Sequence, residues 1–117
     1  MNIKDQVKRM DAMVKQGAIV DTIKEFMADN VATSDYGKSS TMGKSQMVEK
    51  HEGFAASIAK VNGITHHHSL VNDNVSASEF TFDFDMKDGT KIYWHEIIRR
   101  IWNDEGKVTR EEYFNAG

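Results

Sequence analysis

The sequence predicts an α+β fold in which three helices, all in the N-terminal half, lie across a curved antiparallel sheet. Apolar residues recur every three to four positions through the first half of the chain, as they do on one face of a helix. After Asn62-Gly63 they recur at every second position, as on one face of a strand. Because no helix is expected between the later strands, a parallel doubly wound sheet is excluded.

Each helix is expected to be amphipathic. The first covers about residues 2–15 and ends before Gly17, a residue that suits a C-terminal cap. Its apolar stripe consists of Ile3, Val7, Met10, Met13 and Val14. The second helix is shorter and closes at Asp29-Asn30, with a stripe of Ile19, Val20, Ile23, Phe26 and Met27. The third covers about residues 43–60, and one of its faces carries Met47, His51, Phe54, Ala55 and Ile58.

The remaining segments predict strands. Residues 31–36 are expected to form a short strand and residues 37–41 a loop. Four longer strands follow over residues 64–71, 75–86, 90–102 and 107–114, with turn signals between them. Antiparallel strands of this length have to curve, and helices across the open side of a curved sheet leave a cavity.

Length and composition exclude several classes of protein. The 117 residues suffice for one domain, expected to span residues 1–117. The net charge of −3 and the scattered basic residues argue against a nucleic-acid-binding role. The lack of cysteine excludes disulfides and thiolate metal sites. No segment approaches the roughly 20 apolar residues of a membrane span, and the N-terminus lacks the apolar core of a signal peptide, so a cytoplasmic protein without membrane contact is expected.

Three stretches of the chain form a familiar set: residues 26–37 (FMADNVATSDYG), residues 86–89 (MKDG) and residues 96–114, which contain Trp102 and the run REEYF. Together they resemble the SnoaL-like and ketosteroid-isomerase-like branch of the nuclear transport factor two-like superfamily. The resemblance implies a cone-shaped, cystatin-like α+β barrel that encloses a pocket. It does not fix the function, because the superfamily includes isomerases, cyclases, dehydratases, hydrolases and non-enzymatic binders.

Asp35 is the candidate catalytic residue. By resemblance it lies where ketosteroid isomerases place their catalytic base, just after a short strand that follows the second helix. A carboxylate in an apolar cavity has a raised pKa and can act as a base near neutral pH. The alternative is that Asp35 only opens the turn before Gly37.

The rest of the isomerase apparatus is not matched. The resemblance would require a tyrosine on the first helix and a protonated aspartate on a later strand as an oxyanion hole. Met10 and Met13 occupy the first position, and Ile98 lies near the second. Without those donors, steroid isomerisation of the ketosteroid isomerase type is excluded as the specific activity.

The long strand over residues 90–102 supplies the candidate binding residues. Alternation places Trp94, Glu96, Ile98, Arg100 and Trp102 on one face, which the resemblance favours as the cavity side. Glu96 and Arg100 could pair with each other as a structural ion pair or hold a ligand. Tyr36 is expected in the same site, and so are Glu111 and Tyr113 on the last strand.

The run His66-His67-His68 invites comparison with metal sites. Alternation would put His66 and His68 on one face, with a third ligand from Asp83, Asp85 or His95. No known metal spacing is matched, so no metal and no cofactor is expected. We expect instead that one of these histidines faces the interior with a hydrogen bond and another lies on the outer face near a dimer partner. His66 and His68 are the candidate binding residues of the run. His51 is expected to be a hydrogen-bonded core residue.

Two functions remain open on the sequence. One is an enzyme that transfers a proton on a small apolar or cyclic substrate, with Asp35 as base. The other is a non-catalytic ligand-binding or accessory domain with the same pocket. The exposed sheet face combines Glu79, Thr81, Asp83 and Asp85 with Tyr93, His95 and Arg99, and such mixed charge suits a sheet-to-sheet homodimer.

Overall fold

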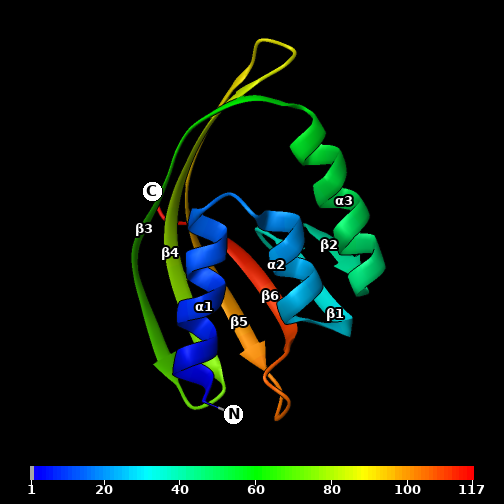
Figure 1. Cartoon of the computed structure of the whole chain (residues 1–117), viewed down its shortest axis with the longest axis vertical. Coiled ribbons are helices and arrows are strands. Elements are labelled where there is room, and N and C mark those ends of the chain that lie inside the picture. Colours follow the sequence, from blue (N-terminus) through cyan, green and yellow to red (C-terminus); the bar gives the residue numbers. More distant parts are fainter. Residues whose placement is uncertain (1) are drawn as a thin grey trace.

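Three helices cover one face of a six-stranded sheet in the computed structural model, which describes residues 2–117 apart from the side chain of Ser39 (Figure 1). The helices are α1 (Ile3–Lys15), α2 (Ile19–Phe26) and α3 (Lys44–Ala56). Among the described residues, no helix has the length and apolar character needed to cross a membrane. The predicted three-helix half of the chain is confirmed.

Local capping explains where α1 begins and ends. The Asn2 side chain accepts a hydrogen bond from the backbone N–H of Lys4 at 2.9 Å, so it caps the N-terminus. Gly17 adopts a left-handed φ of 82°, and the N–H of Ala18 bonds back to the carbonyl of Met13 at 3.1 Å. This is the Schellman arrangement, in which glycine avoids the steric penalty of a Cβ. The chain is thereby redirected into α2.

The strands are β1 (Met27–Asp35), β2 (Ser39–Met42), β3 (Ile58–Asn72), β4 (Val75–Met86), β5 (Lys91–Trp102) and β6 (Val108–Asn115). Their order in the sheet is β2-β1-β6-β5-β4-β3. The four strands of the predicted meander pair antiparallel, as expected. The sheet as a whole is mixed, because β1 runs parallel to β6.

Three predicted boundaries are wrong. Residues 39–42 form β2 rather than part of a loop, because they pair antiparallel with the end of β1. The second helix ends at Phe26, and the strand after it begins at Met27 instead of residue 31. The third helix ends at Ala56, and β3 begins at Ile58, where its residues pair with the far end of the long strand β4. At the ends of the second and third helices, pairing in the sheet overrides a local helical pattern.

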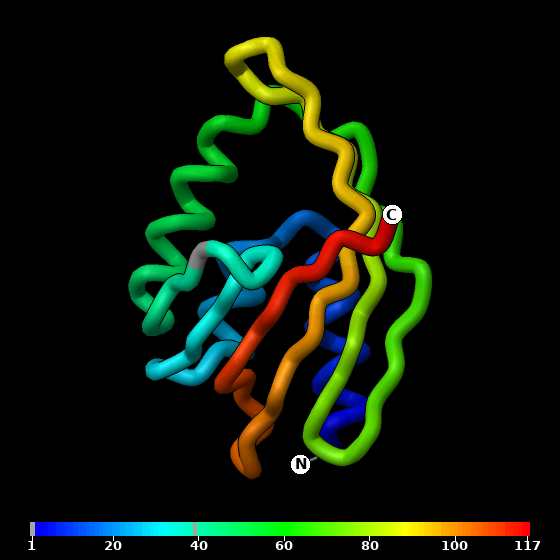
Figure 2. Tube along the Cα trace, turned by 180° about the vertical axis from the view of Figure 1, so that it is seen from behind, coloured from blue at the N-terminus to red at the C-terminus, as the bar shows by residue number. Residues whose placement is uncertain are grey.

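The sheet bends around the helices. Register shifts interrupt the β3–β4, β5–β6 and β1–β6 pairings, and such bulges bend and twist a strand. In Figure 1 the long strands β3 and β4 arch past α1 and α2. The opposite side of the sheet, seen in Figure 2, carries none of the helices that residues 2–117 form. The sheet therefore has an inner face under the helices and a bare outer face.

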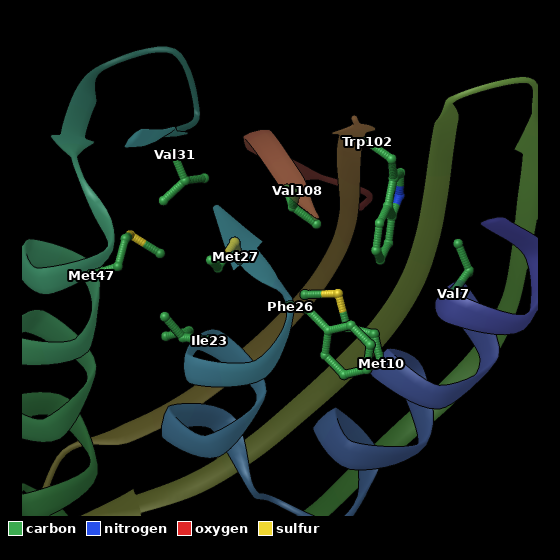
Figure 3. Packing of buried hydrophobic residues seen from close by; sticks show 9 residues of the cluster. All are labelled: Val7, Met10, Ile23, Phe26, Met27, Val31, Met47, Trp102 and Val108. Atoms are coloured by element: carbon green, nitrogen blue, oxygen red, sulfur yellow. The ribbon is translucent and has the colours of Figure 1, made fainter. Parts of the chain in front are cut away.

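The core consists of two apolar clusters. The first joins the helices to β1, β5 and β6 and contains Val7, Met10, Ile23, Phe26, Met27, Val31, Met47, Trp102 and Val108 (Figure 3). In it the rings of Phe26 and Trp102 meet edge to face at 6.3 Å, and the Trp102 indole N–H donates to Ser76 at 2.9 Å. The second contains Val14, Phe80, Phe82, Phe84 and Ile98. The strict alternation of β4 thus supplies one wall of the interior.

Candidate functional site

A pocket of about 260 Å³ lies between the helices and the inner face of the sheet. Its walls are mostly apolar and come from both core clusters, from α3 and from β5. They consist of Met10, Val14, Ile19, Ile23, Met27, Phe54, Phe82, Phe84, Trp94 and Ile98. A cavity of this size and lining suits a small, largely apolar molecule.

Polar side chains gather in the remaining wall of the pocket. They are Thr22, Asp35, Tyr36, Lys50, His51, Glu96, Arg100, Glu111 and Tyr113. Six of the residues expected from the sequence are in this group: Asp35, Tyr36, Glu96, Arg100, Glu111 and Tyr113. Strand β6 and the end of β1 bring them together, since Asp35 pairs with Tyr113 and Arg100 with Glu111 in the sheet.

Glu96 is a buried carboxyl in the pocket wall. Glu96 is only 5% exposed, and its Oε2 accepts a hydrogen bond from the Tyr36 hydroxyl. Burial raises the pKa of Glu96; the Tyr36 hydrogen bond works against this, and the charges of Asp35 and Glu111 add to it. Burial and the bond to Glu96 in turn raise the pKa of Tyr36. Glu96 thus has the surroundings of a proton acceptor.

The backbone of Tyr36 is held in an unfavourable conformation. Its φ of 55° lies in the left-handed region, which is uncommon for an aromatic residue. The Tyr36 N–H donates to the carbonyl of Tyr113 at 2.9 Å, which fixes the turn against β6. Strain of this kind persists only where the surrounding structure enforces it, and here it aims the hydroxyl at Glu96.

Arg100 is the centre of a buried ionic network behind the pocket. Its Nε lies 2.9 Å from Glu111 Oε2 and its Nη1 3.3 Å from Asp11 Oδ1, and all three side chains are at most 3% exposed. Burial alone would lower the pKa of Arg100, but Glu111 and Asp11 outweigh it and raise the pKa. The Tyr113 hydroxyl donates to Glu111 Oε1 at 2.6 Å, and burial followed by the Glu111 charge raises the pKa of Tyr113. Arg100 therefore already serves two carboxylates.

Asp35 lies at the edge of the same pocket and is more exposed than Glu96. Its Oδ2 accepts a hydrogen bond from Lys50 Nζ at 2.6 Å, and its side chain is 31% exposed. It is therefore a carboxylate paired with an ammonium group, in contrast to the buried Glu96.

His51 also lines the pocket, although the sequence suggested only a core residue. Its Nδ1 is 3.0 Å from the carbonyl oxygen of Met47. Because a carbonyl can only accept, Nδ1 donates in this contact, and Nε2 is the nitrogen left to accept a proton.

The two tryptophans are separated by the fold. Trp94 lines the pocket, where its ring stacks on Phe54 of α3 at 5.6 Å. Trp102 was expected beside it but lies in the first core cluster (Figure 3), at the far end of β5 beyond a register shift. It is not among the pocket-lining residues that the described chain supplies.

The histidine run does not follow the predicted alternation. A bulge between His66 and His68 puts two consecutive residues on the outer face. His66 remains inside, stacked on Phe80 at 4.8 Å, with Nε2 2.8 Å from Ser69 Oγ and 3.5 Å from Asp11 Oδ2. His68 lies outside, with Nε2 2.8 Å from Glu79 Oε1. The expectation that His66 and His68 share a face is therefore wrong.

Four polar residues of this region were not predicted as part of the site: Asp11, Thr22, Lys50 and His51. Asp11 had a readable signal, because it follows Val7 by four residues and precedes Val14 by three, on the apolar face of α1. A charged residue in that stripe needs a buried partner, which is Arg100. Lys50 had no such signal, since its partner comes from another element.

Solved structures share this fold over nearly the whole chain. A SnoaL-like protein from Mesorhizobium loti, named as a candidate polyketide cyclase, superposes with a TM-score of 0.87 at 23% identity, covering 97% of this chain and 99% of its own. An NTF2-like protein of unknown function from Burkholderia pseudomallei gives 0.79 at 11% identity, covering 98% and 91%. A protein with a ketosteroid isomerase-like fold from Catenulispora acidiphila, in complex with trimethylamine, gives 0.69 at 12% identity, covering 81% and 73%.

Sequence comparison adds no closer relative. No protein-family model matches the chain, and a search of curated proteins finds no match. At these identities the solved structures establish the fold and leave the activity open. The resemblance drawn from the sequence is thus confirmed: this chain has the fold of the SnoaL-like, ketosteroid isomerase-like and NTF2-like proteins.

Proposed function

We propose that this protein binds a small, largely apolar molecule in the pocket and catalyses a proton transfer on it. One observation carries the proposal: Glu96 is a buried carboxyl in the wall of a largely apolar pocket, and one of its oxygens accepts a hydrogen bond from the Tyr36 hydroxyl. A carboxyl that is oriented and shielded from water is the usual form of a general base or acid.

The proposed reaction class is proton abstraction next to an electron-withdrawing group such as a carbonyl. The carbon–hydrogen bond breaks, its proton passes to Glu96, and the electron pair moves onto the carbonyl oxygen. Return of the proton at another position completes an isomerisation, and loss of a neighbouring hydroxide completes a dehydration. Lys50 lines the pocket and has donor hydrogens beyond the one that it gives to Asp35, so it could stabilise the developing charge.

The geometry favours Glu96 over Asp35 as the base. Asp35 is paired with Lys50 and partly exposed, whereas Glu96 is buried and accepts a hydrogen bond from the uncharged Tyr36 hydroxyl. Asp35 then helps to hold Lys50 at the edge of the pocket. Arg100 and Glu111 are paired with each other, and Arg100 also with Asp11, so we assign them a structural role beside Glu96.

Two pairs of variants test the proposal. Titration with small cyclic enones, phenols and lactones should quench the fluorescence of Trp94, which lines the pocket. Trp94→Phe should remove the quenching, and Trp102→Phe should leave it in place. Once a ligand class is found, Glu96→Gln should lower turnover by roughly 100-fold or more with little change in affinity, in keeping with the usual contribution of a general base.

The same experiments separate the alternatives. If Asp35→Asn abolishes turnover and Glu96→Gln does not, the base is Asp35, as the sequence suggested. A ligand that binds without any turnover that depends on either carboxylate would point to the non-catalytic binding domain. If no compound of the panel quenches Trp94, the proposed substrate class is wrong.

We also propose that the outer face of the sheet pairs with a second copy of the chain. Ile97 and Phe114 are partners in the sheet there and are 37% and 42% exposed. Beside them, Glu112 lies near both Arg99 and Arg110, so both signs of charge flank an apolar centre. A two-fold axis through such a patch can place apolar groups against each other and opposite charges in register.

A further inference from the structure

The bulge in β3 creates a cluster of imidazoles on the outer face of the sheet. His67 and His68 both lie on that side, His67 with its Nε2 2.7 Å from the Thr81 hydroxyl. In the β4–β5 pairing Thr81 is the partner of His95, so His67, Thr81 and His95 form a row across three neighbouring strands. The rings of His67 and His95 are 5.3 Å apart.

One carboxylate lies in the middle of this cluster. Glu79 on β4 is two residues from Thr81, on the same side of the strand. Its Oε2 is 2.6 Å from His95 Nε2 and its Oε1 2.8 Å from His68 Nε2. The hydrogen bond from His95, followed by the nearby charges of the histidines, lowers the pKa of Glu79. The carboxylate is thus held between imidazoles from both neighbouring strands.

We propose that His67, Glu79 and His95 form a binding site for a divalent transition-metal ion of the zinc type, with one ligand from each of β3, β4 and β5. Two imidazoles and one carboxylate are a ligand set that Zn²⁺ uses, with a fourth position open to water. The ligand atoms of the three residues all lie within 4.8 Å of one another.

Only small movements are needed to form the site. Tetrahedral coordination with zinc–ligand distances of about 2.0–2.1 Å requires ligand atoms about 3.4 Å apart. Side-chain rotation can bring the three groups to this spacing, because His67 is exposed and the other two are half-buried. His68, which contacts the other oxygen of Glu79, would orient that carboxylate as an outer partner. The bound ion would tie together three strands of the sheet.

This site is separate from the pocket. His95 and Glu96 are neighbours in β5, so their side chains point to opposite faces of the sheet. The proposal therefore stands whether or not the pocket is catalytic. It also departs from the expectation of no metal, because that expectation paired His66 with His68 on one face.

Competition against a chromophoric zinc chelator tests the proposal on metal-free protein. The wild type should take up one Zn²⁺ per chain in a saturable manner. Glu79→Gln and His95→Gln keep the side-chain shapes similar but remove a ligand. Each should weaken binding by at least the roughly 10- to 100-fold that loss of an outer-shell partner alone causes.

His66→Gln is the matched control, since it removes an adjacent histidine that faces the interior. It should leave zinc affinity unchanged, and circular dichroism should show that all variants fold. Co²⁺ should give the intense visible absorption of a tetrahedral site in the wild type and lose it in Glu79→Gln. The proposal is overturned if the wild type shows no saturable uptake, or if His66→Gln weakens binding as much as His95→Gln.

Discussion

The buried carboxyl of Glu96 makes stability depend on pH in a defined direction. Because burial raises its pKa above the ordinary 4.5, folding favours the protonated form. The contribution of Glu96 to stability is therefore most favourable at a pH below the ordinary pKa of glutamate. It is lost as the pH rises through the raised pKa that Glu96 has in the folded protein. The loss is about 1.4 kcal/mol for each unit of pKa shift.

Replacing Glu96 by glutamine should remove this loss. Glu96→Gln keeps an acceptor for the Tyr36 hydroxyl and carries no charge, so it should melt at a higher temperature than the wild type at neutral pH. The difference should vanish in acid. The other ionisable groups that line the same pocket are unchanged; they are Asp35, Tyr36, Lys50, His51, Arg100, Glu111 and Tyr113.

Thermal melts across the acidic to neutral range check this expectation. They should be run with a chelator, so that the His95 site holds no metal. Glu112→Gln on the outer face, where the carboxylate pairs with Arg99 and Arg110, serves as control and should not gain stability at neutral pH. A constant difference between Glu96→Gln and wild type at every pH would contradict the proposed titration.

Arg100 is expected to be among the most sensitive residues of the fold. Arg100→Met would leave Asp11 and Glu111 buried without their cation, at a cost of roughly 3–5 kcal/mol. The neighbouring Arg99 provides the comparison, because its pair with Glu112 is 41% exposed on the arginine side. Arg99→Met should cost no more than about 1 kcal/mol. Urea denaturation measures the free energy of unfolding of each variant. If Arg100→Met and Arg99→Met lose the same stability, the buried network around Arg100 is not the stabilising feature that its burial indicates.

At the scale of the elements, Phe54 of α3 packs against the sheet at the pocket through two aromatic contacts. Phe54 stacks on Trp94 at 5.6 Å and meets Phe84 edge to face at 5.9 Å. Phe54→Ala should lower stability by about 1–3 kcal/mol, below the usual cost for a fully buried phenylalanine because this one is half-buried. It should also change the emission of Trp94.

The exposed face of α3 supplies the control for this prediction. Glu52→Ala should leave both stability and Trp94 emission near wild type, because surface substitutions usually change stability by less than about 0.5 kcal/mol. Chemical denaturation followed by fluorescence reports both quantities. If Phe54→Ala is as stable as Glu52→Ala, the packing of α3 does not depend on these contacts.

Elements with a strong period could be predicted from the sequence, and elements defined by distant pairing could not. The alternating phenylalanines of β4 and the stripe of α1 identify those elements directly. Strand β2 carries no apolar pattern (SSTM) and forms only because β1 offers it an edge. The helix-like pattern around Ile58 loses to the pairing of β3 with β4 for the same reason.

The residues of the candidate site show the same difference between what a local pattern predicts and what distant pairing decides. Glu96, Arg100 and Trp94 follow from alternation along β5, which the structure retains. Trp102 also keeps the face that alternation predicts, but it lies eight residues beyond Trp94 along β5 and packs in the first core cluster instead of the pocket. The faces of His67 and His68 depend on a register shift. A bulge adds one residue to a strand and reverses the faces of all that follow, and no local residue signals it here.

At the scale of the whole molecule, the bare outer face predicts a dimer in solution. Ile97→Asp places a charge at the apolar centre of that face, next to Phe114, and should convert the protein to a monomer. Val61→Asp is the control, because Val61 is 51% exposed on the edge strand β3. It should leave the dimer intact.

Sedimentation analysis in the presence of a chelator measures the mass of each variant without any contribution from bound metal. A wild type that sediments as a monomer at every concentration would refute pairing through this face. A dimer that survives Ile97→Asp and dissociates with Val61→Asp would move the interface to the β3 edge. The pocket lies on the helical side of the sheet, so Ile97→Asp should keep the Trp94 response to ligand. The ligand titration on this variant therefore also tests whether one chain alone forms the complete binding site.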